Sequence, residues 1–197
     1  MRDETTAQLQ CQCGLVRGML REASPKHVNR VICYCDDCQM FATYLGRPDL
    51  VDSCGGSDII QTAAGNLLFT SGQEQIRGVR LSADGSYRWY SNCCKTPLGN
   101  MASFTMPAIG IPVAPFLAAG EPLSLRFGEP IGAIRGEYAI GAAPRRARGV
   151  PLSVMARAVP KVLFWKMTGK GRGNPFTSSD GLTVRYSVDV LPAPEAA

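Results

Sequence analysis

Residues 31–39 read VICYCDDCQ and place three of the chain's eight cysteines within six positions. A second group precedes them in residues 11–14, which read CQCG, and a third follows in residues 93–98, which read CCKTPL. Closely spaced cysteines on turns are typical ligands of zinc, which binds about four of them in a tetrahedron. Cysteines that are adjacent or one residue apart do not readily form unstrained disulfides. The grouping therefore predicts metal binding rather than unrelated free thiols or redox pairs.

The cysteine groups alternate with segments that read as short strands. Turn residues such as Gly and Asp separate runs rich in β-branched and aromatic side chains. We expect strands at residues 15–20, 29–34, 59–62, 67–70, 76–81 and 87–90. The fold class predicted is mainly β, with antiparallel sheets around the cysteine sites and a few short helices.

One of those helices is predicted directly after the middle cysteine group. Asp36 or Asp37 would begin it and Gly46 would follow its end, because Asp favours the N-cap and Gly the position after the last turn. We expect both aspartates to cap this helix rather than to act as a general base. Its buried face would carry Cys38, Phe41, Ala42 and Leu45.

Beyond residue 94 the chain has no cysteine and its pattern changes. Residues 96–120 carry no charge, but four prolines would break any membrane-spanning helix, so we expect buried short strands and loops there. Further strands are predicted at residues 123–127, 131–134, 138–140 and 182–191. We divide the chain into a cysteine-rich zinc-binding β domain at residues 1–104 and an extension at residues 105–197 that packs on the same domain.

Residues 138–179 contain no acidic side chain. Residues 150–159 and 160–167 predict two short amphipathic helices within this segment, and the glycine-rich residues 169–173 predict a mobile turn. The segment could face the carboxylates of a small substrate, an acidic partner or a membrane surface. We expect a solvated basic face instead, with the apolar side packed on the β core. The basic residues are Arg145, Arg146, Arg148, Arg157, Lys161, Lys166, Lys170 and Arg172, and the apolar ones are Val154, Val159, Val162, Leu163 and Trp165.

The composition is that of one folded domain: 45% of the 197 residues are hydrophobic and 19% charged, which excludes a disordered chain. A formal net charge of +5 is too small to indicate a nucleic-acid partner. A single histidine, His27, excludes His-dependent triads and two-histidine zinc protease sites. The first 13 residues show no secretory signal, so we expect a cytoplasmic protein with reduced thiols and no membrane partner.

Counting the sulfurs leaves two arrangements open. Eight cysteines could form two four-cysteine sites. The grouping favours a closed site from the first and third groups, Cys11, Cys13, Cys93 and Cys94, and a three-sulfur site from the middle group, Cys33, Cys35 and Cys38. Four protein ligands are typical of structural zinc, whereas three with an exchangeable fourth position are typical of catalytic zinc. Cys54, in a glycine-rich turn, is interpreted as a plain thiol.

The order Cys-x-Cys-Gly, Cys-x-Cys-x-x-Cys and Cys-x-Thr-Pro-Leu resembles the glutathione-dependent formaldehyde-activating enzyme and centromere protein V family over residues 9–100. The resemblance implies a β-tent fold with a structural zinc and a second zinc at Cys33, Cys35 and Cys38. These three would be the catalytic residues, and the open zinc position would take the thiol of glutathione. The implied activity is that of a carbon–sulfur lyase, in which this sulfur adds to formaldehyde or a related small aldehyde.

Two positions depart from the family's third motif. Ser91 stands where the motif has its first cysteine, and Lys95 stands where it has a glycine. Cys93 or Cys54 could supply the missing ligand, or the first site could be incomplete. The alternative function is a non-catalytic, zinc-stabilised binding module for a protein or nucleic-acid partner. In the strand before this motif we expect Trp89 in the core and Arg88 in solvent.

Overall fold

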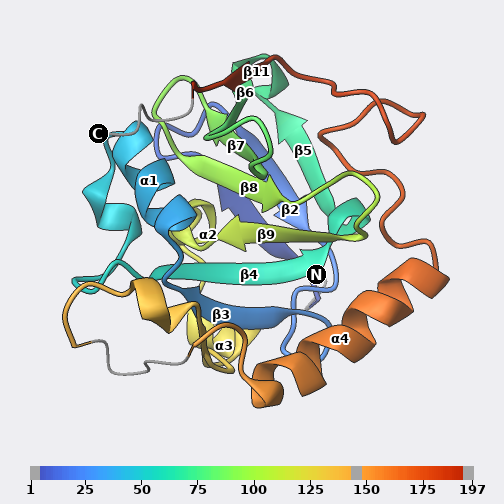
Figure 1. The fold of residues 1–197 in the computed structure, drawn as a ribbon. Coiled ribbons are helices and arrows are strands. Elements are labelled where there is room, and N and C mark those ends of the chain that lie inside the picture. The colour runs from blue at the N-terminus through green and yellow to red at the C-terminus, as the bar shows by residue number, and fades with distance from the viewer. Residues whose placement is uncertain (1–4, 143–147, 193–197) are drawn as a thin grey trace.

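The computed structural model describes residues 5–142 and 148–192, and its strands form two sheets (Figure 1). Arg145, Arg146 and the C-terminal tail lie outside the described residues. The strands are β1 (Ala7–Gln10), β2 (Arg17–Leu20), β3 (Asn29–Cys33), β4 (Ser57–Ala63), β5 (Leu67–Ser71), β6 (Ile76–Arg80), β7 (Tyr87–Ser91), β8 (Pro97–Met101), β9 (Ala108–Pro112), β10 (Ala133–Ile134) and β11 (Val188–Val190). The helices are α1 (Asp36–Tyr44), α2 (Ala114–Ala118), α3 (Leu123–Phe127) and α4 (Leu152–Met167).

The large sheet has the strand order β10-β3-β4-β9-β8-β7-β6-β11, and the small sheet has the order β1-β2-β5. All neighbouring strands pair antiparallel except at the two edges of the large sheet, where β10 pairs parallel with β3 and β11 parallel with β6. The prediction of a mainly β fold with helices is confirmed.

The main core lies between the two sheets. Ile60, Trp89 and Ile111 of the large sheet are fully buried, and they belong to the same apolar cluster as Leu20 and Phe69 of the small sheet. Figure 1 shows the small sheet behind the large one and α1 in front of it. We call the face of the large sheet that turns away from the small sheet its outer face. Because strand side chains alternate, the residue next to each core residue points to this outer face.

Helix α1 confirms the local prediction after the middle cysteine group. It begins at Asp36, and Gly46 follows its end with a φ of 64°. Cys38, Phe41, Ala42 and Leu45 are all buried. Phe41 and Leu45 pack against Tyr90 of β7, so α1 covers part of the outer face.

Two strand predictions for the second half are wrong, and a third is confirmed only in part. Residues 123–127 form α3, because Phe127 packs against Phe116 of α2 with ring centroids 4.8 Å apart. An apolar run of five residues fits a helix as well as a strand. Residues 138–140 form no strand and follow a 3₁₀ turn at Gly136–Tyr138. Residues 182–191 contain only the short strand β11.

Helix α4 replaces the two predicted short helices with a single one that has Pro160 inside it. Pro160 is exposed, so water can hydrate the Ala156 carbonyl that lacks an amide partner. The uncharged residues 96–120 form β8, β9 and α2, as expected for buried short strands and loops. Among the helices of the described residues, none combines the length and the apolar character needed to cross a membrane.

The C-terminal residues complete the core rather than standing apart from it. Strands β9, β10 and β11 all follow residue 104, yet they belong to the large sheet. Phe176 is fully buried and stacks on Trp89, with ring centroids 4.6 Å apart and an interplanar angle of 2°. The large sheet and its core therefore run across the division at residue 104.

Replacing Phe176 with alanine should lower the free energy of unfolding by roughly 3–5 kcal/mol, the usual effect of removing a fully buried aromatic ring. Leu182→Ala is the matched control: Leu182 is exposed, so its truncation should change that energy by less than about 0.5 kcal/mol. Urea unfolding of both variants measures the difference. Equal effects would contradict the account of the C-terminal segment.

Candidate metal centre

Four sulfurs meet where the turn after β1 approaches the turn after β7. The Sγ of Cys11 lies 3.5 Å from that of Cys13 and 3.8 Å from that of Cys93. The Sγ of Cys93 lies 3.3 Å from that of Cys13 and 3.9 Å from that of Cys94. Four thiolates around a tetrahedral zinc, each about 2.3 Å from the metal, would lie about 3.8 Å apart. The four-cysteine cluster therefore has the dimensions of a closed metal site.

Turns and hydrogen bonds around these cysteines position their sulfurs and favour the thiolate form that binds a metal. Gly14, directly after Cys13, has a φ of 77°, which lets the chain turn back so that the Val16 amide donates to Cys11 Sγ at 3.3 Å. The hydroxyls of Ser91 and Thr96 lie 3.4 and 3.3 Å from Cys94 Sγ. Burial raises the pKa of Cys94, but these hydrogen bonds outweigh it and lower the pKa to about 6. A thiol with a lowered pKa readily supplies the thiolate that a metal binds.

The structure accounts for both departures in the third motif. Cys93 joins the four-cysteine cluster, whereas Cys54 belongs to neither cysteine cluster of the described residues. Ser91 is fully buried and holds Cys94 through its hydroxyl. Lys95 has a φ of 55°, in the left-handed region that favours glycine, which explains why a glycine suits this position.

Three further sulfurs meet on the outer face of the large sheet. Cys33 ends β3, Cys35 is the N-cap residue of α1 and Cys38 lies in its first turn. The sulfurs of Cys33 and Cys35 are 3.3 Å apart, and all three lie within 4.8 Å of one another. Within residues 5–142 and 148–192, no other Cys, and no His, Asp or Glu, joins this three-sulfur cluster. Its fourth tetrahedral position is therefore not taken by one of these side chains.

The three thiols share protons. Hydrogen bonds from Cys33 and Cys38 lower the pKa of Cys35 to about 2, and the hydrogen bond with Cys35 raises the pKa of Cys33 to about 11. The pKa of Cys38 is also raised, first by its hydrogen bond with Cys33. The cluster thus loses one proton easily and holds the others. A bound metal ion would be needed to turn all three into thiolates at neutral pH.

The surroundings of Arg88 indicate whether a divalent metal fits the three-sulfur cluster. Its side chain is only 4% exposed, and its Nη2 donates to Asp37 Oδ2 at 3.0 Å. Its Nε and Nη1 are buried and have no hydrogen-bond acceptor among the described residues. The expectation of a solvated Arg88 is wrong, because α1 covers its strand and the guanidinium lies 5.4 Å above the Phe41 ring.

A buried cation of this kind requires nearby negative charge. Burial lowers the pKa of Arg88, but negative charge at the three-sulfur cluster and at Asp37 outweighs it and raises the pKa. The Asp37 side chain is 40% exposed and is therefore a weak partner on its own. A divalent ion with three thiolates carries a net charge of −1, which complements Arg88. The residues present therefore fit a divalent metal.

Asp36 and Asp37 do not cap α1 as expected. The N-cap residue is Cys35, and no side chain caps the helix end. Asp36 Oδ1 accepts a hydrogen bond from the Asp37 amide at 2.9 Å, and Asp37 pairs with Arg88. The middle cysteine of the motif occupies the cap position, which leaves both carboxylates beside the three-sulfur cluster.

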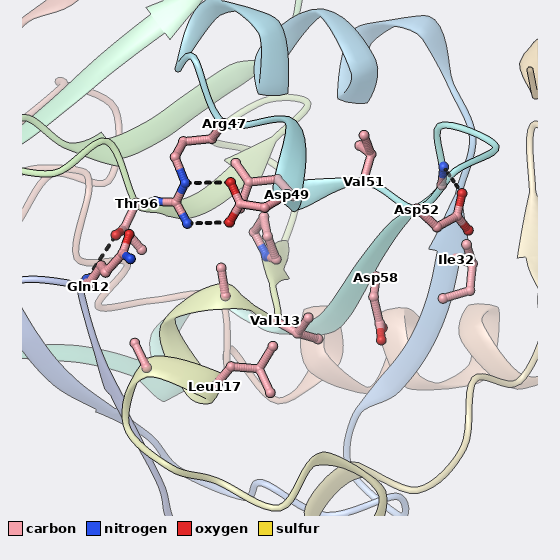
Figure 2. Close-up of a pocket in the computed structure, with 15 residues that line it drawn as sticks. Gln12, Ile32, Arg47, Asp49, Val51, Asp52, Asp58, Thr96, Val113 and Leu117 are labelled. Atoms are coloured by element: carbon pink, nitrogen blue, oxygen red, sulfur yellow. Dashed lines mark hydrogen bonds and ion pairs between the residues drawn. The ribbon is translucent and has the colours of Figure 1, made fainter.

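Two cavities of about 520 Å³ are available to a ligand. Figure 2 shows the first, which lies between the four-cysteine cluster and β4. Its polar groups already have partners: Arg47 binds Asp49 through two bonds of 2.7 and 2.6 Å, and Asp52 accepts from the amides of Cys54 and Gly56. Such a cavity offers a ligand mainly apolar contact.

The second cavity contains the candidate metal ligands and the charged groups beside them. The three-sulfur cluster lines it together with Arg88, and part of the outer face forms its floor. Sequence reasoning missed four of its polar lining residues, which come from β4, β8 and the segment after β10. No local pattern marks them, because the sheet pairing alone brings them together. They are Gln61, Asn100, Arg135 and Tyr138.

Replacing Arg88 with methionine should weaken divalent-metal binding at the three-sulfur cluster about 10- to 100-fold, the usual effect of losing a group that supports metal ligands. Arg88→Lys keeps the charge and should recover most of the affinity. Stepwise Co²⁺ titration, followed by thiolate-to-cobalt absorption, measures both variants. Equal losses in the two variants would contradict a role in charge compensation.

Comparison with known proteins places the chain in a family without assigning an activity. A search of curated proteins finds no match. The model of DUF6151, a family of unknown function, matches residues 4–179, which include both cysteine clusters and most of both sheets. Since this match covers most of the 197 residues, the chain belongs to the DUF6151 family.

Proposed function

We propose that the protein is a zinc-dependent carbon–sulfur lyase that joins a small thiol, such as glutathione, to formaldehyde or a related small aldehyde. One observation carries the proposal. The three-sulfur cluster lies in the wall of a cavity of about 520 Å³, and no described side chain of a metal-binding type takes the fourth ligand position. A metal held there by three ligands can accept a substrate atom as its fourth.

The two clusters would then have different roles. The closed four-cysteine cluster would hold a structural zinc that ties the turn after β1 to the turn after β7. The motif resemblance over residues 9–100 supports this division and the choice of zinc, and a β-tent fold is part of the same proposal. Reduced cysteines at both clusters suit a cytoplasmic location.

The proposed reaction requires no oxidant. Zinc bound to Cys33, Cys35 and Cys38 would stabilise the substrate thiol as its thiolate. The sulfur forms a bond to the aldehyde carbon, the π pair of the carbonyl moves onto its oxygen, and that oxygen takes up the proton lost by the thiol. The product is the S-hydroxymethyl adduct when the aldehyde is formaldehyde.

The chain's own residues would position this step. Asp36 and Asp37 are the carboxylates that line the cavity, so they are the groups available to accept the thiol proton and return it to the oxygen. Asn100 and Gln61 offer amide groups on the cavity floor that can bind the polar parts of the substrate. Arg88 would balance the charge of the loaded cluster from beneath.

The test is to mix the zinc-loaded protein with glutathione and formaldehyde and to follow adduct formation by exchange NMR. Because the adduct also forms without protein, the measured quantity is the exchange rate in excess of the protein-free mixture. The proposal predicts an excess that grows in proportion to protein concentration. No excess with both clusters loaded would favour the alternative, a non-catalytic binding module.

A further inference from the structure

Helix α4 carries an apolar stripe on the side that faces solvent. We define the stripe as Leu152, Met155, Val159, Leu163 and Met167, which recur every three or four residues and therefore share one face of the helix. All five are exposed, by between 43% and 85%, and the neighbouring Phe164 is 51% exposed. The expectation that Val159 and Leu163 pack on the β core is wrong.

A different face of α4 attaches the helix to the domain. Val154 and Trp165 are its buried residues, and Val154 packs in the apolar cluster that contains Cys33 and Cys38. Lys161 Nζ donates to the carbonyl oxygens of Pro25 and Val28, at 3.0 Å for Pro25. Val154 and Leu163 are nine residues apart, which places them on opposite sides of a helix with about 100° per residue. The stripe thus points away from the domain, and Figure 1 shows α4 along its rim.

The charged side chains of α4 are all basic, because the helix contains no acidic residue. Arg148, Arg157, Lys166 and Arg172 are exposed, and none forms an ion pair with another described residue. Lys161 and Lys170 of the same segment are engaged, by backbone carbonyls and by Glu22. Helices that lie in the surface of a negatively charged bilayer combine large apolar side chains with unpaired Lys and Arg residues, as α4 does.

We propose that α4 docks the protein on the surface of a bilayer that contains anionic lipids, with the stripe inserted among the acyl chains and the long side chains of Arg157 and Lys166 reaching the headgroups. The helix is about 24 Å long and lies along the surface rather than across it. A second copy of the chain is a poor occupant, because a two-fold contact between two stripes would bring together two helices that carry cations and no acid. The proposal departs from the sequence-based expectation of a solvated basic face and no membrane partner, because the stripe is exposed rather than packed on the β core.

The test is cosedimentation of the full chain with vesicles of phosphatidylcholine containing 30% phosphatidylglycerol, and with pure phosphatidylcholine vesicles. The native protein should bind the anionic vesicles and lose most of this binding in 1 M salt. Leu163→Glu should weaken binding at least about tenfold through lost apolar insertion. Lys166→Ala should weaken it about fivefold. Leu182→Glu, at an exposed apolar position outside α4, is the matched control and should bind as the native chain does.

Circular dichroism and metal content establish that each variant is folded. Three outcomes would overturn the proposal. They are no binding of the folded native chain to anionic vesicles, equal binding by Leu163→Glu and the native chain, and a native dimer that fails to bind vesicles and becomes monomeric in Leu163→Glu. None of these readouts uses the proposed enzymatic activity, so the two proposals succeed or fail separately.

Discussion

Replacing Cys11 with serine should remove one zinc per chain and lower the free energy of unfolding by more than about 4 kcal/mol, as expected when a structural metal is lost. Cys11 is fully buried and its sulfur lies 3.5 and 3.8 Å from those of Cys13 and Cys93. Without the metal, the turns after β1 and β7 would lose the coordination bonds that tie them together. For a domain of this size the melting temperature should fall by roughly 8–16 °C.

Two controls separate the metal from the side chain. Cys54→Ser changes a cysteine outside both clusters and should leave zinc content unchanged. A strong chelator should lower the melting temperature of the native protein by a similar amount but should have little further effect on Cys11→Ser. A stable Cys11→Ser variant that retains all of its zinc would show that the four-cysteine cluster is not a metal site.

Replacing Cys35 with serine should abolish the excess rate of adduct formation while preserving the fold. Cys35 is the N-cap residue of α1, and serine is among the most favourable residues there, so the helix should remain intact. The loss of activity then reports the lost ligand and not unfolding. The measurement is exchange NMR at equal protein concentration, with thermal unfolding as the check on the fold.

Cys35→Ser also distinguishes the two candidate functions. If the variant accelerates adduct formation as the native protein does, the three-sulfur cluster is not the catalytic site. If the native protein does not accelerate it although it is folded and holds both zinc ions, the chain is not this lyase.

The sequence predicted the first half of the fold well because its signals are local. Short strands separated by glycine-rich turns, and a helix that begins at Asp36 and ends before Gly46, depend on neighbouring residues alone. The cysteine groups could also be sorted into a four-sulfur and a three-sulfur set by spacing, and the structure brings those sets together.

The failures concern features that depend on distant parts of the chain. Arg88 alternates with Trp89 and therefore points away from the main core, which is the pattern of a solvated residue, but α1 covers that face. Residues 123–127 are a different case, because an apolar run of five residues fits a strand or a helix and only its packing on α2 shows which one forms. The apolar side of α4 was assigned to the core, although Val154 and Trp165 are its buried residues and the stripe is left in solvent.

Lys95 illustrates a substitution whose meaning the sequence could not decide. A lysine at a glycine position suggests a changed backbone, yet the φ of 55° is retained. The Lys95 amino group donates to Asn92 Oδ1 at 2.9 Å and lies 5.2 Å above the Tyr90 ring. These contacts hold the side chain of a residue in the left-handed region and preserve the turn that presents Cys93 and Cys94.

Zinc per chain, measured on the native protein and on Cys35→Ser after exhaustive removal of loosely bound metal, tests the central claim most directly. The account predicts two zinc ions in the native chain and one in the variant, because the four-cysteine cluster is closed and independent of the three-sulfur cluster. The same zinc content in both proteins would contradict it, since the three sulfurs of Cys33, Cys35 and Cys38 would then hold no metal.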